Sequence, residues 1–323
     1  MTDDLPAEKT PPKTKKPVLG VARWAVLIVA VTVLGGLALV GRYGAVTPQG
    51  RMFVEARANG LKLGRIGKLN IEGVGGDIWR DFTVRRLTIS DEKGVWLQAD
   101  NLAVRWRSIE LFSRRFHAEA ITARQVQVLR RPTLTPKTKS GAAPVSVDLD
   151  AFGARLILEP AFSGRRGDYD IAGAYEMARL GGQTGRLRVD SRLHAGDFLK
   201  ADFDLGRTDT LRLNAEATEA AGGALAGSLG FDPRLPFALK AKISGEISQG
   251  RFEIDTQLGG RQPLKGAGAW TPQGGSASGT AVLSASTLTA PYGARFGDVA
   301  RARSSLIFSS PILYASAWPG QAM

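Results

Sequence analysis

The pattern of apolar and polar residues divides the chain into one long uncharged run and many short alternating segments. The run extends from Trp24 to Val40 and contains no charged residue. At a helical rise of about 1.5 Å per residue, its length approaches the roughly 30 Å thickness of a bilayer core. The run therefore predicts a transmembrane helix over 18–41, with the anchor residues Trp24, Leu27, Val31, Leu34, Leu37 and Val40.

Two other interpretations of this run fit less well. A cleaved secretory signal has a shorter apolar core and a small-residue cleavage site, which the following Gly41-Arg42-Tyr43 does not provide. A buried helix of a soluble protein usually keeps one polar face. Several lysines and Arg23 precede the run, so the positive-inside rule places the N-terminus in the cytoplasm and the chain after Arg42 outside it.

From Leu69 onward, apolar and polar residues alternate with a period of two, which is typical of half-buried β-strands. Turns rich in Gly, Asn or Asp separate these segments, and the chain contains 39 glycines. The alternation predicts strands at 69–73, 82–89, 95–99, 102–106, 118–129, 145–149, 155–158, 169–175, 185–190, 199–205, 210–215, 237–243, 251–256 and 279–283.

These elements predict a mainly β fold, in which a single N-terminal transmembrane helix precedes an elongated, curled antiparallel β-meander with an apolar groove. A short helical crossing is expected at 108–112, and a short amphipathic segment at 51–60. We divide the chain into a disordered cytoplasmic tail at 1–17, the anchor at 18–41, a first periplasmic β segment at 42–131, a linker at 132–144, repeated groove strands at 145–303 and an atypical end at 304–323, where we expect a truncation.

An apolar sheet face has to be covered or filled. It can close into a sandwich or barrel, form an ordinary packed β core, or stay open as a groove. Aromatic residues make up only 7% of the chain, so modest side chains leave room for acyl chains, whose burial contributes about 0.8 kcal/mol per CH₂. Periodicity alone favours the packed core and the open groove equally. The groove-lining candidates are Leu69, Ile71, Phe82, Val84, Leu87, Leu102, Val104, Val126 and Val128.

Composition narrows the function classes. The chain has no cysteine, which excludes disulfides, thiol catalysis and cysteine-based zinc sites. A net charge of +13 invites a nucleic-acid interpretation, but the basic residues are scattered singly among acidic ones. An exported chain meets anionic lipid headgroups rather than DNA. We therefore expect solvated strand faces close to a membrane and no nucleic-acid partner.

The sequence indicates no catalytic or cofactor site. His117 and His194 lie in separate strand-like segments without a partner at a recognisable spacing, and no Ser-His-Asp site is indicated. The glycines at 73–76 do not fit the dinucleotide fingerprint. Trp96 and Trp106 more often close the end of an apolar sheet than stack on a ligand. We predict no enzyme activity, no cofactor and no metal.

An ordered series of motifs resembles a known family. The series is Leu69-x-Ile71-x-Gly73-x-x-Gly76, Phe82-x-Val84-x-x-Leu87, Trp96, Leu102-x-Val104-x-Trp106, Leu111 and Val126-x-Val128-x-Arg130-Arg131-Pro132. After an N-terminal anchor and Gly50, this order resembles the N-terminal part of the TamB family, the inner-membrane subunits of the translocation and assembly module within the AsmA-like group of bridge-like proteins. Later glycine-marked strands, including 236–243, look like the following repeats of that family.

The resemblance implies a single-pass inner-membrane protein whose periplasmic β-groove reaches toward an outer-membrane barrel partner of the TamA kind. It implies roles in assembling outer-membrane proteins and in moving phospholipid between the membranes. Family members are several times longer and dock the barrel through a C-terminal domain, which we expect to be missing from residues 1–323. About fifteen strands at roughly 4.8 Å spacing give a groove of only about 70 Å. A periplasmic scaffold with a closed β core and no lipid cargo is the alternative function, and an anchored hydrolase with a polar cleft is the third.

Overall fold

The computed structural model describes residues 47–63, 65–135, 145–179, 181–206 and 209–307. The predicted cytoplasmic tail at 1–17 and the predicted transmembrane helix at 18–41 lie outside the described residues, as do most of the linker and residues 308–323. No helix within the described ranges is both long enough and apolar enough to cross a membrane.

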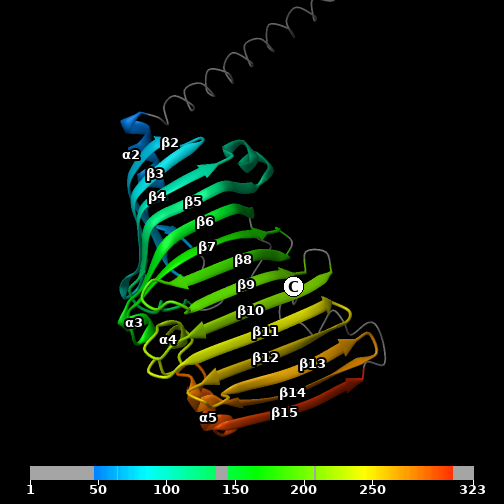
Figure 1. Cartoon of the computed structure of the whole chain (residues 1–323). Helices are drawn as coiled ribbons and strands as arrows, with labels where there is room; N and C mark the ends of the chain where they lie inside the picture. Colours follow the sequence, from blue (N-terminus) through cyan, green and yellow to red (C-terminus); the bar gives the residue numbers. More distant parts are fainter. Residues whose placement is uncertain (1–46, 64, 136–144, 180, 207–208, 308–323) are drawn as a thin grey trace, which may run out of the picture.

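The strands of the described chain form one fifteen-stranded sheet, which is elongated and curled (Figure 1). Strands follow one another in chain order from β1 to β15, so the predicted mainly β meander is confirmed. The strands are β1 (Leu61–Lys62), β2 (Lys68–Asp77), β3 (Asp81–Asp91), β4 (Gly94–Trp106), β5 (Arg115–Val128), β6 (Ser146–Leu158), β7 (Gly167–Met177), β8 (Gln183–Ser191), β9 (Phe198–Leu205), β10 (Thr210–Glu219), β11 (Phe237–Glu246), β12 (Gly250–Leu258), β13 (Leu264–Thr271), β14 (Gly274–Val282) and β15 (Val299–Ile307).

Short helices lie along the margins of the sheet. The predicted crossing at 108–112 is confirmed as a 3₁₀ helix, η1 (Ser108–Ser113). The predicted segment at 51–60 is the helix α2 (Pro48–Ala58), which starts earlier because the Thr47 hydroxyl accepts a hydrogen bond from the Gly50 N–H (3.1 Å) and caps it. The remaining helices are α3 (Pro160–Ser163), α4 (Leu225–Ser228), η2 (Leu283–Ala285) and α5 (Ala290–Phe296).

One strand pair departs from the predicted antiparallel meander. β5 and β6 run parallel, and Arg115 at the start of β5 lies opposite Ser146 at the start of β6. A parallel pair needs a crossover of a dozen or more residues to bring the chain back to the same end. The proline-rich segment between these strands is that crossover, and sequence periodicity carries no signal for the direction in which the next strand runs.

Two consecutive arginines fasten the crossover to the sheet. Arg130 donates from both terminal nitrogens to Asp91 (2.9 and 2.5 Å), and the Thr133 N–H donates to the same carboxylate (2.6 Å). The hydrogen bonds from Arg130 hold the pKa of Asp91 well below its usual range. Arg131 donates to the Gly227 carbonyl at α4 (2.8 Å). The crossover is therefore tied at one end to the β3–β4 turn and to α4.

Two pairs of predicted strands merge into longer ones. The segments at 95–99 and 102–106 both belong to β4, and those at 145–149 and 155–158 both belong to β6. Asn101 adopts a positive φ of 49°, and the β6–β7 register shifts between Leu149 and Phe152. Bulges of this kind change the phase of alternation without ending the strand. Strands β1, β13 and β15 were not predicted, and in β13 glycine and alanine dilute the alternating pattern. β15 continues to Ile307, past the expected end of the groove strands at 303.

The buried core gathers where α3 and α4 lie against the sheet. Glu219 is 2% exposed, and its carboxylate accepts hydrogen bonds from the Tyr169 hydroxyl (2.8 Å) and from the N–H groups of Leu225 (2.7 Å) and Ala226 (2.8 Å). A buried carboxylate is tolerated only when hydrogen-bonded in this way. Glu219 therefore holds α4 against β7 and β10.

Helix α2 covers the N-terminal edge of the sheet. The Glu55 carboxylate accepts from the Val74 N–H (2.6 Å), and the Asn59 amide oxygen accepts from the Ile71 N–H (2.7 Å). Arg51 donates to the Gly76 carbonyl (3.2 Å). Side chains of α2 thus satisfy backbone groups of β2 that an uncovered edge strand would present to other chains.

Candidate functional site: the apolar face of the sheet

Cross-strand register decides which residues share a face, because directly opposite residues in neighbouring strands point to the same side. Phe82 of β3 lies opposite Val104 of β4, which lies opposite Ile121 of β5. Continuing strand by strand gives a line of uncharged residues that we call row 2. Its members are Gly76, Phe82, Val104, Ile121, Phe152, Gly173, Leu187, Ala201, Ala215, Ala241, Ile254, Gly266 and Gly279.

Two further rows flank row 2 on the same face, and neither contains a charged residue. Row 1 consists of Val74, Val84, Leu102, Ala123, Ala154, Ile171, Val189, Leu199, Ala217, Leu239 and Thr256. Row 3 consists of Trp106, Ala118, Leu149, Tyr175, Gly185, Phe203, Leu213, Ile243, Phe252, Gly268 and Ala277. We call the side of the sheet that carries rows 1 to 3 the apolar face.

The opposite side, which we call the polar face, carries charge along the same strands. Lys240 lies opposite Glu216 on one neighbouring strand and Asp255 on the other. The line continues through Arg188, Lys200 and Lys265. The contrast between a charged row and an uncharged row in the same strands assigns the two faces unambiguously.

All predicted groove-lining residues lie on the apolar face. Val84 and Leu102 belong to row 1, and Phe82 and Val104 to row 2. The others belong to two further rows beyond row 1: Ile71, Leu87 and Val126 share one row with Ala99, and Leu69 and Val128 share the next with Ile89 and Leu97. Several of them are packed into the core, with exposures of 8% for Ile71, 2% for Val84, 6% for Val104 and 9% for Val128. At this end of the sheet, packing against α2 and neighbouring loops therefore covers much of the predicted lining.

The more open part of the apolar face lies farther along the chain, in β9 to β14. Its side chains are half-buried and lie outside the hydrophobic clusters of the described residues: Ala201, Phe203, Leu213, Ala215, Ala241, Ile243, Phe252 and Ile254. The main contacts of these strands are with their neighbouring strands. Sequence reasoning did not select these residues, although their alternation was recognised, because register was needed to align them in rows.

Aromatic rings on the apolar face lie over glycines of the next strand. Phe252 is opposite Gly268, and a Cβ added at Gly268 would come within 2.5 Å of the Phe252 ring. Phe203 and Gly185 show the same arrangement, at 2.7 Å. Each ring therefore lies across its neighbouring strand, where the missing side chain leaves room. This arrangement keeps bulky rings on an apolar surface that is otherwise lined by small and aliphatic residues.

Two tryptophans close margins of the sheet, as the sequence indicated. The Trp96 indole N–H donates to the Ile66 carbonyl (2.8 Å), and the Trp106 indole N–H donates to the Ile78 carbonyl (2.8 Å). Each indole ring is thus apolar over most of its surface and hydrogen-bonded at its N–H group. Their hydrogen-bond donors are occupied by the protein's own backbone.

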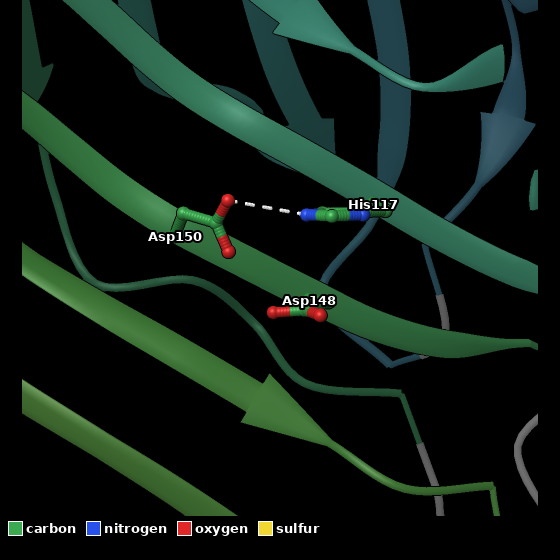
Figure 2. A group of neighbouring side chains, drawn as sticks. All are labelled: His117, Asp148 and Asp150. Atoms are coloured by element: carbon green, nitrogen blue, oxygen red, sulfur yellow. Dashed lines mark hydrogen bonds and ion pairs between the residues drawn. The ribbon is translucent and has the colours of Figure 1, made fainter.

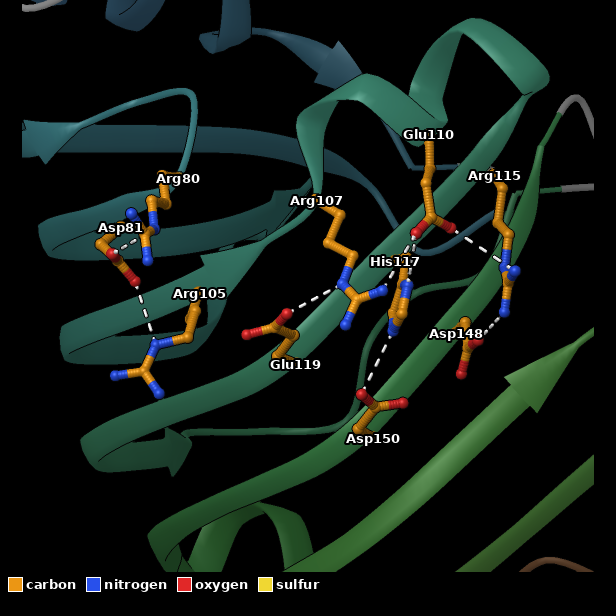
Figure 3. Close-up of polar contacts among 10 residues, drawn as sticks. All are labelled: Arg80, Asp81, Arg105, Arg107, Glu110, Arg115, His117, Glu119, Asp148 and Asp150. Atoms are coloured by element: carbon orange, nitrogen blue, oxygen red, sulfur yellow. Dashed lines mark hydrogen bonds and ion pairs between the residues drawn. The ribbon is translucent and has the colours of Figure 1, made fainter.

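A second candidate lies on the polar face, where η1, β5 and β6 meet (Figure 2). His117 is 7% exposed, and its Nδ1 lies 2.9 Å from a Glu110 carboxylate oxygen, while its Nε2 lies 3.2 Å from an Asp150 oxygen. No sequence spacing indicated these partners of His117, because the parallel crossover brings Asp150 beside it. Figure 3 shows the wider network, in which Arg115 pairs with Asp148. Hydrogen bonding to Glu110 raises the pKa of His117.

Metal binding is the obvious alternative for this cluster. Among the described residues, His117, Asp148 and Asp150 place ligand atoms within 4.8 Å of one another. However, both ring nitrogens of His117 face carboxylates, and Arg115 already pairs with Asp148. A raised pKa favours the doubly protonated imidazolium, which has no lone pair for a metal. The arrangement fits an ion-pair network that fastens η1 to the sheet better than it fits a metal centre.

Hollows in the described surface lie mainly on the polar face. One of them is lined by residues that include Lys242, Arg251, Glu253 and Arg303, and another by residues that include Asp148, Glu176, Asp202, Asp204 and Arg212. These linings are charged and line up across neighbouring strands. Both linings also include residues of row 3, among them Phe252 and Gly268 in the first hollow and Tyr175 and Phe203 in the second. We take the apolar face as the main candidate because an uncharged, half-exposed face is unusual for a protein surface.

Comparison with known proteins adds no assignment, since no protein-family model, curated protein or solved structure matches the chain. The resemblance in motif order therefore stays a prediction. The case for a function rests on the geometry of the apolar face.

Proposed function

We propose that this chain is a non-enzymatic, membrane-anchored periplasmic protein that binds phospholipid acyl chains along its apolar face. In this proposal it passes phospholipid between the inner and outer membranes, or assists outer-membrane protein assembly, as a TamB-like component with an outer-membrane barrel partner of the TamA kind. The uncharged run at Trp24 to Val40 and the motif order support this location and family. The N-terminus lies in the cytoplasm and the sheet in the periplasm.

The observation that carries the proposal is the continuity of rows 2 and 3. They run without a charged residue through β14, and in β9 to β14 their larger side chains are half-buried. An acyl chain needs continuous apolar contact, which contributes about 0.8 kcal/mol per buried CH₂. At about 4.8 Å per strand, a row from β2 to β14 extends about 60 Å, enough for several acyl chains side by side.

The proposal is tested by lipid retention in a pair of matched variants. Ala241 lies in row 2 between Ala215 and Ile254, whereas Ala269 lies on the polar face opposite Arg251. Ala241→Glu places a charge among apolar side chains, and Ala269→Glu places the same charge beside an arginine. Native mass spectrometry and lipid extraction of the full chain in mild detergent are expected to find several phospholipids per wild-type chain. We expect loss of most of them in Ala241→Glu and retention in Ala269→Glu.

The alternative function is a periplasmic scaffold with a closed β core. The burial of Val84 and its neighbours in a hydrophobic cluster favours this alternative at the N-terminal end of the sheet. A folded wild-type chain without bound phospholipid would support the scaffold. Equal lipid retention by Ala241→Glu and Ala269→Glu would show that bound lipid does not occupy row 2.

A further inference from the structure

Large apolar side chains are exposed at one end of the sheet. They belong to α2, to the turn between β2 and β3, and to η1. We call them the end surface, defined by Met52 (60% exposed), Phe53 (65%), Trp79 (37%), Ile109 (76%) and Phe112 (85%). Such a group of exposed apolar side chains on a charged protein marks a surface that contacts a partner or a membrane.

Hydrogen bonds place these three segments at the same strand ends. Arg51 in the first turn of α2 donates to the Gly76 carbonyl (3.2 Å), just before the β2–β3 turn. That turn meets the end of β4, where Trp106 donates from its indole to Ile78 (2.8 Å) and from its backbone to Arg80 (3.0 Å). η1 follows directly after β4. Figure 1 shows α2 and the teal turn between β4 and β5, which contains η1, on the two sides of the upper, N-terminal part of the sheet.

The orientation of η1 is opposite to that expected for a simple connection. Its polar residue Glu110 points inward to the buried His117, as Figure 3 shows. Its apolar residues Ile109 and Phe112 are instead the exposed ones. A connection that only joined two strands would bury its apolar residues and expose its carboxylate. The ion-pair network beneath η1 holds it in this orientation.

Arginines surround the exposed apolar side chains. Arg114 at the end of η1 is exposed, whereas Arg107, Arg115 and Arg80 also form ion pairs with Glu119, Asp148 and Asp81. Apolar and aromatic side chains with a basic border are typical of surfaces that enter the headgroup region of anionic membranes. An acidic protein could also bind such a surface. A membrane accounts for its position better, because the end surface adjoins Thr47, where the chain arrives from the predicted transmembrane helix.

We propose that the end surface docks on an anionic phospholipid bilayer, with Phe112 and Ile109 inserted among the headgroups and Arg114 on lipid phosphates. Docking would set the N-terminal end of the apolar face against the membrane. The inference rests on the membrane anchoring in the proposed function, but not on lipid binding by the apolar face.

The absence of cysteine allows a clean test with single-cysteine variants of the full chain. A nitrobenzoxadiazole label is placed at Phe112→Cys, at Ala25→Cys in the predicted anchor, or at Leu193→Cys. Leu193 is 58% exposed and follows β8 at the opposite strand ends, so it is the matched control. The chain is reconstituted in vesicles of equal parts phosphatidylethanolamine and phosphatidylglycerol with brominated acyl chains. We expect loss of fluorescence and a blue shift at 25 and 112, and neither at 193.

The remaining outcomes separate the two proposals. Quenching at 25 without quenching at 112 would overturn the docking inference and leave the proposed function standing. Quenching at neither position would overturn both, since both require the anchor. Arg114→Glu in the Phe112→Cys background is expected to reverse most of the quenching at 112, while Arg114→Lys retains it. Quenching that is unchanged by Arg114→Glu would overturn the assignment to anionic lipid.

Discussion

At the scale of single residues, His117 shows how one side chain fixes the position of a whole connection. The charged groups that face it come from η1, from the strands beside it and from their flanks: Glu110, Asp148, Asp150, Arg107 and Arg115. Both ring nitrogens donate to carboxylates only when the imidazole is protonated. Hydrogen bonding to His117 in turn lowers the pKa of Glu110. The network therefore stabilises η1 most strongly when His117 and Glu110 are both charged.

This pairing predicts a pH-dependent stability. The contribution of His117, whose pKa is raised, is complete below its ordinary value of 6.5 and is lost as pH rises through the raised pKa. The contribution of Glu110, whose pKa is lowered, is complete above its ordinary value of 4.5. His117→Gln is therefore expected to destabilise the full chain by about 1–2 kcal/mol between these two pH values, and by less at alkaline pH. Thermal unfolding in detergent, followed by circular dichroism over a pH series, measures the difference.

The matched control is His194→Gln. The His194 side chain is 50% exposed and lies 3.7 Å from Asp197, so its loss should change stability little at any pH. A destabilisation by His117→Gln that stays constant across the pH series would contradict the role assigned to the protonated ring.

At the scale of elements, α2 acts as a cover for the edge strand β2. Met52 and Phe53 on its outer side are exposed, and Arg51, Glu55 and the C-cap Asn59 satisfy backbone groups of β2. An edge strand whose N–H groups are unpaired invites pairing with other chains. One short helix thus protects the sheet on one side and presents part of the end surface on the other.

Removing one of these contacts predicts a local loss of protection. Glu55→Ala leaves the Val74 N–H without its acceptor, which is expected to cost about 1–3 kcal/mol and to speed amide hydrogen exchange in β2. Glu72→Ala is the control, because Glu72 is an exposed residue of the same strand. Exchange measured by mass spectrometry on the full chain should rise in β2 for Glu55→Ala alone. Equal exchange in both variants would show that α2 does not protect this edge.

At the scale of the whole molecule, each strand is paired with the strand before it and the strand after it. This arrangement resembles a repeat protein, in which stability is the sum of local units and their nearest-neighbour contacts. A destabilising substitution at one end of such a sheet should therefore lower the stability mainly of the neighbouring strands. The packed N-terminal end and the more open apolar face in β9 to β14 are therefore expected to respond independently.

Two substitutions test this independence. Val84→Ala removes methyl groups from a side chain that is 2% exposed, at a cost of about 2 kcal/mol, and Gly268→Ala pushes a methyl group against the Phe252 ring, at a cost of about 1–3 kcal/mol. Hydrogen exchange is expected to rise in β2 to β5 for the first variant and in β12 to β14 for the second. A uniform rise along all strands in either variant would show a single cooperative unit instead.

Much of this architecture could be predicted from the sequence. Alternation located most strands, and all of the predicted groove-lining residues share one face. The sequence did not predict which of these side chains are accessible to a ligand, since Val84 and Val104 are packed in the core. The open residues around Ala241 and Ile254 were not selected. Accessibility depends on what packs over a face, and α2, α3 and α4 are supplied by distant parts of the chain.

The sequence by itself determined the period of two, the turns and the apolar character of one side of each strand, because side-chain alternation is a local property of extended backbone. Only the tertiary structure decided the register that aligns these sides into rows, the parallel pairing of β5 with β6 and the meeting of His117 with Asp150. Each of these depends on contacts between residues far apart in the chain. A one-residue change of register would turn a strand's apolar side to the other face without changing its sequence pattern.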